Sequence, residues 1–352
     1  MVSHQAVLTR LIQHGDFSRE EMLEIMRQIM TGAYTPVQIA GFLMAMRVKG
    51  EKPVEIAAAA ELMREMATRI NIKDPDHLVD TCGTGGDGAH TFNVSTASAI
   101  VAAAAGARVA KHGGRSVSST CGSADVLEAL GVAVNLSPEA VSRSIDVLGI
   151  GFMFAPNYHS AMKHAVTVRR ELGVRTLFNL LGPLTNPAGA KRQVMGVFHV
   201  DLVPLLAHVL AELGSEHVLV VHGVDGMDEI SISNETCIAE LRGGRVTEYR
   251  ISPEEFGMSR QSLTTIQVNS INDARQMLVD VLRGGAGAAG DIVRLNAGAA
   301  IYVSGVASTL GEGVIMADEV IRSGAAQIKL ERLVNYSQEL QSIDNDPLAE
   351  IS

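Results

Sequence analysis

Four glycines fall within six positions of the segment DTCGTGGDGAHTFNVSTASAI, which spans residues 80–100. The segment begins as a plausible strand and ends in small residues typical of a helix. Glycine permits positive φ and close approach to the backbone, and a helix N-terminus offers unpaired N–H groups. The pattern therefore predicts a loop that wraps an anion such as phosphate. The alternative is a tight strand-to-helix turn with a polar cap.

The same glycines match the dinucleotide pattern G-x-G-x-x-G at Gly83, Gly85 and Gly88. A dinucleotide site also needs an acidic residue about 20 positions further on, at the end of the next strand. The next predicted strand here ends in Lys111 and His112, so that position is basic. The sequence also lacks G-x-x-x-x-G-K-[ST], the pattern of an ordinary P-loop. Neither nucleotide-binding class is supported.

A second polar loop lies in AKHGGRSVSSTCGSADVLEALG, residues 110–131, again between a strand and a helix. It offers two cations, Lys111 and Arg115, together with several serine hydroxyls. Loops at the carboxyl ends of successive parallel strands face one crevice. Amides, hydroxyls and cations together predict a site for more than one phosphate. His112 could act there as a general base or as a hydrogen-bonding support.

A third loop, in VVHGVDGMDEISIS (residues 220–233), carries Asp225, Asp228 and Glu229 after an apolar strand. Mg²⁺ takes one or two carboxylates beside substrate phosphates and keeps several waters. The alternative is an acidic solvated loop, but a phosphate crevice in the same sheet favours the metal. The three loops together predict a Mg²⁺-assisted enzyme acting on a polyphosphorylated small molecule.

A fourth segment, residues 153–188, contains consecutive arginines at Arg169 and Arg170 on a predicted helix. Two adjacent residues cannot share one helix face. One arginine is therefore a candidate to turn inward towards a carboxylate, while the alternative is that both meet solvent. The segment ends in NLLGPLTNP, which is typical of a rigid connector.

The elements that must position these loops change in character along the chain. Residues 1 to about 70 predict helices, with a capping box at Ser18 and Glu21 and a helix start at Thr35 and Pro36. From about residue 76, short apolar strands alternate with helices, which predicts a mostly parallel sheet. The expected strands cover 77–82, 107–112, 132–136, 151–155, 192–198 and 217–223.

The predicted fold class is α/β, with a small all-helical N-terminal domain and a larger α/β domain around a mostly parallel central sheet. The expected domains are 1–72, joined by part of 165–190, and 73–352. Of the 352 residues, 47% are hydrophobic and 19% charged, as in ordinary soluble proteins. No apolar run is long enough for a membrane span, and three scattered cysteines favour the reducing cytoplasm. The net charge of −10 disfavours nucleic-acid binding.

At this point four motifs in order, GTGGDGAHTFNVST, KHGGRSVSSTCGSADVLEALG, VRRELGVRTLFNLLGPLTNP and HGVDGMDEIS, closely resemble the anthranilate phosphoribosyltransferase family. The resemblance covers nearly the whole chain. It implies a homodimer whose active site lies between the two domains. It also implies transfer of phosphoribose from phosphoribosyl pyrophosphate (PRPP) to the amine of anthranilate, in tryptophan biosynthesis, with release of pyrophosphate.

The resemblance also assigns residues. It implies PRPP binding by Gly83, Gly86, Asp87, Thr91, Asn93, Val94, Ser95, Thr96, Lys111, His112, Gly113, Gly114, Arg115, Ser116, Val117, Ser118, Ser119 and Ser123. It implies Mg²⁺ binding by Ser95, Asp228 and Glu229. It implies anthranilate binding by Gly83, His112, Gly114, Pro156, His159 and Arg169, which selects Arg169 over Arg170. No general acid or base is implied, because Lys111 and Mg²⁺ stabilise charge on the departing pyrophosphate.

One position departs from the family pattern. The family usually has K-H-G-N-R, with an asparagine that contacts anthranilate, whereas this chain has Gly114 there. A missing hydrogen bond to a charged group costs roughly 1.5–3 kcal/mol, or about tenfold or more in affinity. The alternatives that stay open are a phosphoribosyltransferase for another aromatic amine and an enzyme similar to pyrimidine nucleoside phosphorylase. A family member that binds nucleic acid is a third, and it would require a basic surface.

Overall fold

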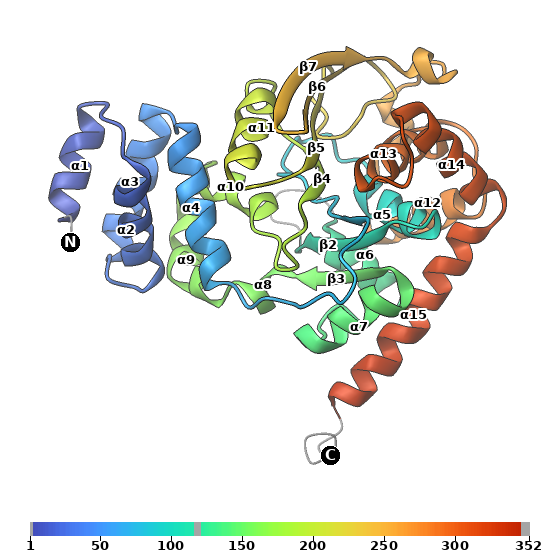
Figure 1. Ribbon diagram of the computed structural model, residues 1–352, viewed down its shortest axis with the longest axis horizontal. Coiled ribbons are helices and arrows are strands. Elements are labelled where there is room, and N and C mark those ends of the chain that lie inside the picture. Colours follow the sequence, from blue (N-terminus) through green and yellow to red (C-terminus); the bar gives the residue numbers. More distant parts are fainter. Residues whose placement is uncertain (1–2, 116–120, 346–352) are drawn as a thin grey trace.

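A computed structural model describes residues 3–115 and 121–345. Its N-terminal part is a helical bundle of α1 (His4–Ile12), α2 (Arg19–Met30), α3 (Pro36–Lys49) and α4 (Pro53–Met66). The predicted caps are confirmed: Ser18 forms a capping box with Glu21, and Thr35 caps α3 with Pro36 in its first turn. The bundle lies to one side of the α/β part, with α4 between the two (Figure 1).

Within the described residues, seven strands form two hydrogen-bonded sheets. The first sheet is parallel, in the order β1 (Leu78–Val79), β2 (Arg108–Gly113) and β3 (Ile150–Phe154). The second contains β4 (Arg192–Gly196), β5 (His217–Gly223), β6 (Thr236–Arg242) and β7 (Arg245–Ile251), with β4 and β5 parallel and the rest antiparallel. A parallel bridge between Asp80 and Gln193 joins the sheets. The carboxyl ends of β1, β2, β4 and β5 therefore meet at one edge.

One expected strand was wrong, and one pair of strands was not predicted. Residues 132–136 form no strand and pair with no strand of the described chain. Their apolar side chains are buried, and Ala133 N–H donates 3.0 Å to the Ser337 hydroxyl of a C-terminal helix, so a helix satisfies the backbone in place of a ladder. The antiparallel pair β6–β7 was not predicted, because β7 alternates exposed and half-buried residues and has little apolar pattern.

Helices cover the sheets on both sides, and the predicted fold class is confirmed. α5 and α13 pack against each other in the main core, and α15 runs along the edge of the molecule towards the C-terminus (Figure 1). The covering helices are α5 (Val94–Ala104), α6 (Ser123–Ala129), α7 (Pro138–Leu148), α11 (Leu202–Glu212), α12 (Ile271–Leu282), α13 (Ala288–Ser304), α14 (Leu310–Arg322) and α15 (Ala325–Asp344). Short 3₁₀ turns occupy Ser160–Met162, Gly182–Leu184, Pro253–Phe256 and Leu263–Ile266.

The chain returns to the bundle after β3. The short α8 (Ala155–Tyr158) leads to α9 (Lys163–Leu172), which packs against α3 and α2 through Ala165 and Val168. α10 (Phe178–Leu181) then brings the chain back towards β4. The same core cluster continues into α11 and β5, so the bundle and the second sheet share buried surface.

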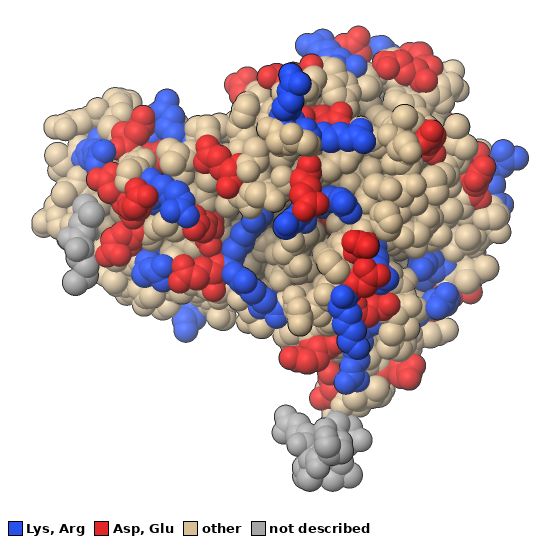
Figure 2. Space-filling model, in the orientation of Figure 1, with Lys and Arg blue, Asp and Glu red and all other residues tan. Residues whose placement is uncertain are grey.

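No helix in the described ranges is long and apolar enough to cross a membrane. On the face drawn in Figure 2, basic and acidic side chains are interspersed and form no extended basic patch.

Candidate active site

Lys111 lies near the carboxyl end of β2 and is almost wholly buried. Its ammonium donates 3.1 Å to both the carbonyl and the hydroxyl oxygen of Thr81, and 3.3 Å to the Ser95 hydroxyl. Thr81 precedes the glycine loop, and Ser95 stands in the first turn of α5. The structure therefore ties the glycine loop, β2 and the helix N-terminus together at one cation.

Three carboxylates meet beside this cation. The N–H of Asp228 donates 3.3 Å to a carboxylate oxygen of Asp87 in the glycine loop. Burial, and then the charges of Asp87 and Glu229, raise the pKa of Asp228 well above its ordinary value. Burial also raises the pKa of Glu229 to about 7, although the charge of Lys111 and hydrogen bonds from Ser95 oppose that rise. Asp87 was predicted as a PRPP ligand, and its proximity to Asp228 was not foreseen.

The donor set of this cluster fits Mg²⁺. Carboxylates this close disfavour one another's charged form, and a divalent cation relieves that repulsion. Asp228, Glu229 and the Ser95 hydroxyl offer hard oxygen ligands. In the part of the chain that the structure describes, no group of three His, Cys, Asp or Glu is arranged to hold a metal by itself. That suits Mg²⁺, which completes its shell with water and substrate phosphate.

Within the described residues, Asp225, the remaining carboxylate of the loop after β5, forms hydrogen bonds only inside that loop. Both Ser231 and Ser233 donate their hydroxyls to Asp225, and the N–H of Met227 donates to it over 3.3 Å. These bonds close the loop after β5 on itself. Asp225 therefore shapes the loop, while Asp228 lies beside Asp87 and Glu229 beside Ser95.

The close packing of backbones explains two glycines at this edge. A Cβ on Gly83 would lie 2.7 Å from the carbonyl oxygen of Gly196, at the end of β4. A Cβ on Gly196 would overlap the carbonyl of Asp228. The glycine loop, the end of β4 and the acidic loop are thus stacked backbone on backbone. By contrast Gly86 has φ +83° and an open surrounding except for Arg175, so its requirement is conformational.

Several polar atoms at the start of α5 lack partners within the described part of the chain. The Asn93 side chain donates 3.0 Å to the Cys121 carbonyl, but its own oxygen is buried and unpaired. The buried hydroxyl of Thr96 is unpaired as well. Val94 is packed into the core, while Thr91 pairs as an isolated bridge with Gln267. Buried polar atoms without partners are costly, which is typical of a site that a ligand completes.

The second predicted loop is only partly described. Ser116, Val117, Ser118 and Ser119 lie outside the described residues. A Cβ on Gly113 would overlap the Ser123 hydroxyl and lie 3.0 Å from the Phe152 ring, and the Ser123 hydroxyl donates 3.3 Å to the Gly114 carbonyl. A Cβ on Gly114 would meet no described atom within 4 Å.

Arg115 is turned away from the other predicted PRPP residues. Its guanidinium donates to both carboxylate oxygens of Glu128 at 2.7 and 2.8 Å, and to Asp125 at 2.9 Å, all on α6. These carboxylates raise the pKa of Arg115. The structure therefore leaves Lys111, and not Arg115, as the cation at the centre of the cluster.

His112 and His159 form the polar core of the predicted acceptor side. Both are buried, and their rings meet edge to face with centroids 5.1 Å apart. His112 Nδ1 lies 3.2 Å from the Gly182 carbonyl, which can only accept, so Nδ1 carries the proton and Nε2 is an acceptor. Burial lowers the pKa of His112 to about 3 and that of His159 to about 4. Neither His112 Nε2 nor either nitrogen of His159 has a partner among the described residues.

The two consecutive arginines of α9 separate as the helical pattern predicts. Arg169 is partly buried and lies over the ring of Phe178 at 5.5 Å, whereas Arg170 is exposed. Burial lowers the pKa of Arg169. No described carboxylate forms an ion pair with Arg169, so its charge is available to a ligand. Pro156, also predicted here, is exposed on α8.

Sequence analysis missed a buried carboxylate below the loops. Asp80 is 1% exposed and accepts hydrogen bonds from the Asn186 side chain at 2.6 Å and the His112 N–H at 3.2 Å. Burial raises its pKa to about 6, although these bonds and Lys111 oppose the rise. Asp80 thus ties the NLLGPLTNP connector to β2. The only feature of the sequence that pointed to a buried Asp80 was its position between an apolar strand and a glycine loop.

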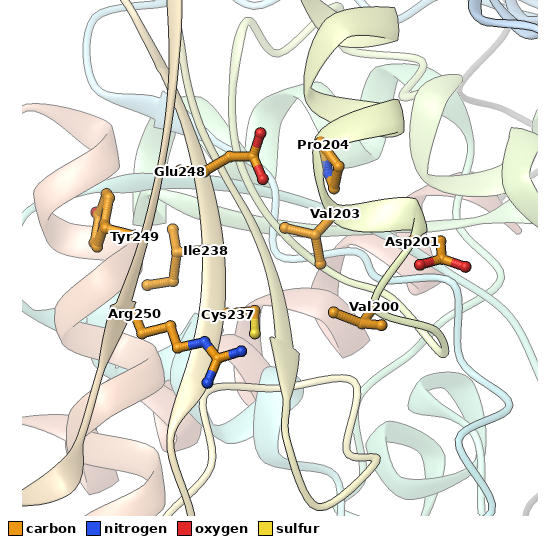
Figure 3. A pocket seen from close by; sticks show the side chains of 9 residues that line it. All are labelled: Val200, Asp201, Val203, Pro204, Cys237, Ile238, Glu248, Tyr249 and Arg250. Atoms are coloured by element: carbon orange, nitrogen blue, oxygen red, sulfur yellow. The ribbon is translucent and has the colours of Figure 1, made fainter.

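A surface cavity lies elsewhere. It has a volume of about 390 Å³ and is lined by the start of α11 with the loop before it and by β6 and β7, including Cys237, Glu248 and Arg250 (Figure 3). It is open to solvent, and none of the predicted site residues lines it. The chemistry-bearing residues therefore gather at the strand ends and not in this cavity.

Comparison with known proteins identifies the class first. Residues 5–67 match the helical bundle domain of a glycosyl transferase family, and residues 75–327 match the a/b domain of the same family. The chain is therefore an enzyme of the glycosyltransferase type.

Individual relatives identify the family within this class of enzyme. The chain is 61% identical over 337 residues to the anthranilate phosphoribosyltransferase of Thiobacillus denitrificans, covering 96% of this chain and 98% of that protein. It is 58% identical to that of Laribacter hongkongensis, covering 97% and 99%. The chain belongs to the anthranilate phosphoribosyltransferase family, and the resemblance noted from its motifs is confirmed.

Solved structures agree. The enzyme from Thermus thermophilus superposes with a TM-score of 0.89 at 44% identity, covering 94% of this chain and 99% of that one. The enzyme from Saccharomyces cerevisiae, in complex with PRPP and Mg, superposes with a TM-score of 0.85 at 26% identity, covering 96% and 99%.

Proposed function

We propose that this enzyme transfers the 5-phosphoribosyl group of PRPP to the amine of anthranilate, releasing pyrophosphate, as a step of tryptophan biosynthesis. The observation that carries the proposal is the convergence of the glycine loop, Lys111 and the carboxylates of Asp228 and Glu229 around Ser95. The Saccharomyces cerevisiae enzyme, a member of the same family, binds PRPP with Mg, and it also binds 4-fluoroanthranilate.

The donor side supplies charge stabilisation. Breaking the bond between ribose C1 and pyrophosphate leaves positive character on the sugar and adds negative charge to the leaving group. Lys111 and the amides of the glycine loop are fixed before the reaction, so they stabilise that negative charge without reorganisation. Mg²⁺ held by Asp228, Glu229 and Ser95 would neutralise pyrophosphate charge. Asn93 and Thr96 would satisfy their buried oxygens on the donor.

The acceptor side supplies orientation. The amine of anthranilate is neutral at pH 7, so its lone pair needs no base to expose it. His112 and His159, neutral at that pH, offer acceptor nitrogens for the amine N–H groups. Arg169 would bind the anthranilate carboxylate, since its half-buried charge has no partner among the described residues. Closure of the loops would exclude water that otherwise hydrolyses the activated sugar.

We also propose that the predicted domains, 1–72 with part of 165–190 and 73–352, are the working units of the enzyme. The packing of α9 on α2 and α3 supports this division. The active site would then lie at their junction, with Arg169 contributed from the helical side and Lys111 from the α/β side. Cytoplasmic location belongs to the same proposal, supported by the three free cysteines.

A homodimer completes the proposal. Val37, Met44 and Val48 are exposed by 81%, 36% and 72%, and their spacing puts them on one face of α3. Ile12 on α1 is 75% exposed. A second copy of the chain would cover this apolar face. We expect light scattering to give twice the 37.3 kDa chain mass, and V48E to shift the protein towards the monomer. A wild-type monomer at micromolar concentration would contradict the dimer.

The reaction itself is tested by the loss of anthranilate fluorescence when protein, PRPP, Mg²⁺ and anthranilate are mixed. We expect loss that requires both PRPP and Mg²⁺. No loss, with calorimetric binding of PRPP and Mg²⁺ intact, would refute anthranilate as the acceptor while leaving the donor site. No binding of either substrate would refute the proposed function as a whole.

A further inference from the structure

Arg175 lies in the connector between α9 and α10, outside every predicted ligand set. Its guanidinium carbon is 4.2 Å from the ring centroid of Phe198, and its Nη2 donates a hydrogen bond to the Gly86 carbonyl. Although Arg175 is exposed, it forms no ion pair with any carboxylate of the described residues. A cation with no acidic partner, stacked on a ring and directed at the glycine loop, is unusual for a surface arginine.

The ring under Arg175 is itself attached to the same loop. The Phe198 N–H donates 3.2 Å to the hydroxyl of Thr84. The Thr84 N–H in turn donates 2.9 Å to the Gly196 carbonyl at the end of β4. Arg175 and Phe198 therefore hold the loop at two points, Gly86 and Thr84, and join both to the rigid stack of backbones at β4.

The hydrogen bond to Gly86 sets the direction of a peptide group. In a trans peptide the carbonyl and the following N–H point in opposite directions. With the Gly86 carbonyl held towards Arg175, the N–H of Asp87 points to the opposite side of the loop. Gly86 has φ +83°, so without this contact its peptide is free to rotate into other conformations that glycine allows.

We propose that Arg175 is a positioning residue for the PRPP loop: stacked on Phe198, it holds the Gly86 carbonyl and so orients the loop amides before PRPP binds. The inference rests on the proposed function and deepens it. Arg175 also follows Arg169 closely, past the left-handed helix end at Gly173. One short segment thus presents one cation to the acceptor side and another to the donor loop.

The test compares Arg175→Gln with Arg170→Gln, a matched change at an exposed arginine of the same segment. We expect R175Q to raise the KM for PRPP about tenfold, the size of one hydrogen bond from a charged group. The KM for anthranilate should stay within about twofold of the R170Q value, because the acceptor side is not touched. The melting temperature should stay within a degree or two of that of R170Q, because the core is not touched either. Arg175→Lys keeps the charge but loses the planar stack on Phe198. Its KM for PRPP should therefore lie between those of the wild type and R175Q.

The Phe198→Leu variant provides an independent test of the same contact. Removing the ring while keeping Arg175 should raise the PRPP KM about two- to fivefold, the scale of an exposed cation–π contact. In R175Q the same change should add nothing. The proposal is overturned if R175Q leaves the PRPP KM equal to that of R170Q, or raises both substrate KM values equally. If the wild type does not consume anthranilate, calorimetric PRPP binding decides instead: about tenfold weaker binding in R175Q supports the role, and equal binding refutes it.

Discussion

On the donor side of the site, Lys111, Thr81 and Ser95 are joined by hydrogen bonds, and backbones stack at Gly83 and Gly196. On the acceptor side, His159 has neither ring nitrogen bonded among the described residues, and Arg169 has no ionic partner there. The donor side is therefore held together largely by stacked backbone and one bonded cation, although the buried side-chain oxygens of Asn93 and Thr96 lack partners among the described residues. The acceptor side is built from side chains on separate elements and is left for a ligand to satisfy.

The contrast has a physical reason. A polyphosphate is bound by many amides together with Mg²⁺, so its site must be rigid and closely packed. A small aromatic acid is bound by a few directed side chains in a desolvated space. The difference also predicts that changes to the donor side will damage catalysis or stability broadly, whereas changes to the acceptor side will act on one substrate.

The largest effect is expected from replacing both metal-side carboxylates. Asp228→Asn with Glu229→Gln removes the charges that fit Mg²⁺, and turnover should fall by roughly a thousandfold because electrostatic stabilisation of the leaving group is lost. The Mg²⁺ concentration for half-maximal rate should rise in parallel. Asp201→Asn is the control, because the Asp201 side chain is 85% exposed and lies outside the carboxylate cluster. An unchanged Mg²⁺ requirement in the double variant would remove these residues from the metal site.

The backbone stack is tested by Gly196→Ala. A methyl group would overlap the Asp228 carbonyl, so the strand end must move, at a cost of roughly 3 kcal/mol. For a chain of this length the melting temperature should then fall by roughly 4 °C. Gly311→Ala is the matched control, because a Cβ there meets nothing within 4 Å and the residue lies in α14, so its stability should stay equal or rise. Equal melting temperatures for G196A and G311A would mean that the backbones at Gly196 and Asp228 can move apart at little cost.

On the acceptor side, Arg169→Ala should weaken anthranilate by about 10- to 100-fold, the range for losing a hydrogen-bonded charge pair. The KM for PRPP should change little, because Arg169 contacts none of the donor residues. Steady-state kinetics with each substrate varied measures the split, with Arg170→Ala as control. Equal loss for both substrates would indicate a structural role for Arg169.

Mg²⁺ binding should depend on pH through the donor side alone. The pKa of Glu229 is raised to about 7 in the metal-free protein, and Mg²⁺ competes with that proton. Affinity should therefore be near its maximum above pH 7 and fall by up to about tenfold per pH unit below it. Calorimetry in two buffers at pH 6 and 8 should show more proton release at pH 6 than at pH 8. Affinity that is flat across this range would contradict the raised pKa.

The smallest effect concerns the departure from the family pattern. Gly114→Asn adds a donor and acceptor where a Cβ meets none of the described atoms within 4 Å, so we expect anthranilate to bind about tenfold more tightly. PRPP binding should not change. Fluorescence titration with anthranilate measures the affinity of the wild type and of G114N. Weaker binding would show that the pocket has been rebuilt around glycine.

Local features were predictable from the sequence alone. The caps at Ser18 and Thr35 depend on residues three positions apart, and the separation of Arg169 from Arg170 follows from helical periodicity. The order of strands and loops also placed the three polar loops at one sheet edge. Short motifs sufficed here because each contact lies within one turn or follows from parallel topology.

Non-local contacts were not predictable. Residues 132–136 have the pattern of a strand, yet they pack beside α15, which lies about two hundred positions away in the chain. The sequence showed that Gly83 must exclude a side chain, and a ligand was the expected reason. The tertiary structure shows that the carbonyl of Gly196 occupies that space.

The sequence by itself determined the helical bundle, the α/β alternation and the residue types of the donor loops, because propensity, capping and glycine spacing act over a few residues. Only the tertiary structure decided that Arg115 pairs with α6, that Asp87 joins Asp228, and that Arg175 holds the glycine loop. Those outcomes depend on which side chains from distant segments share a neighbourhood, and burial and charge then select the partners.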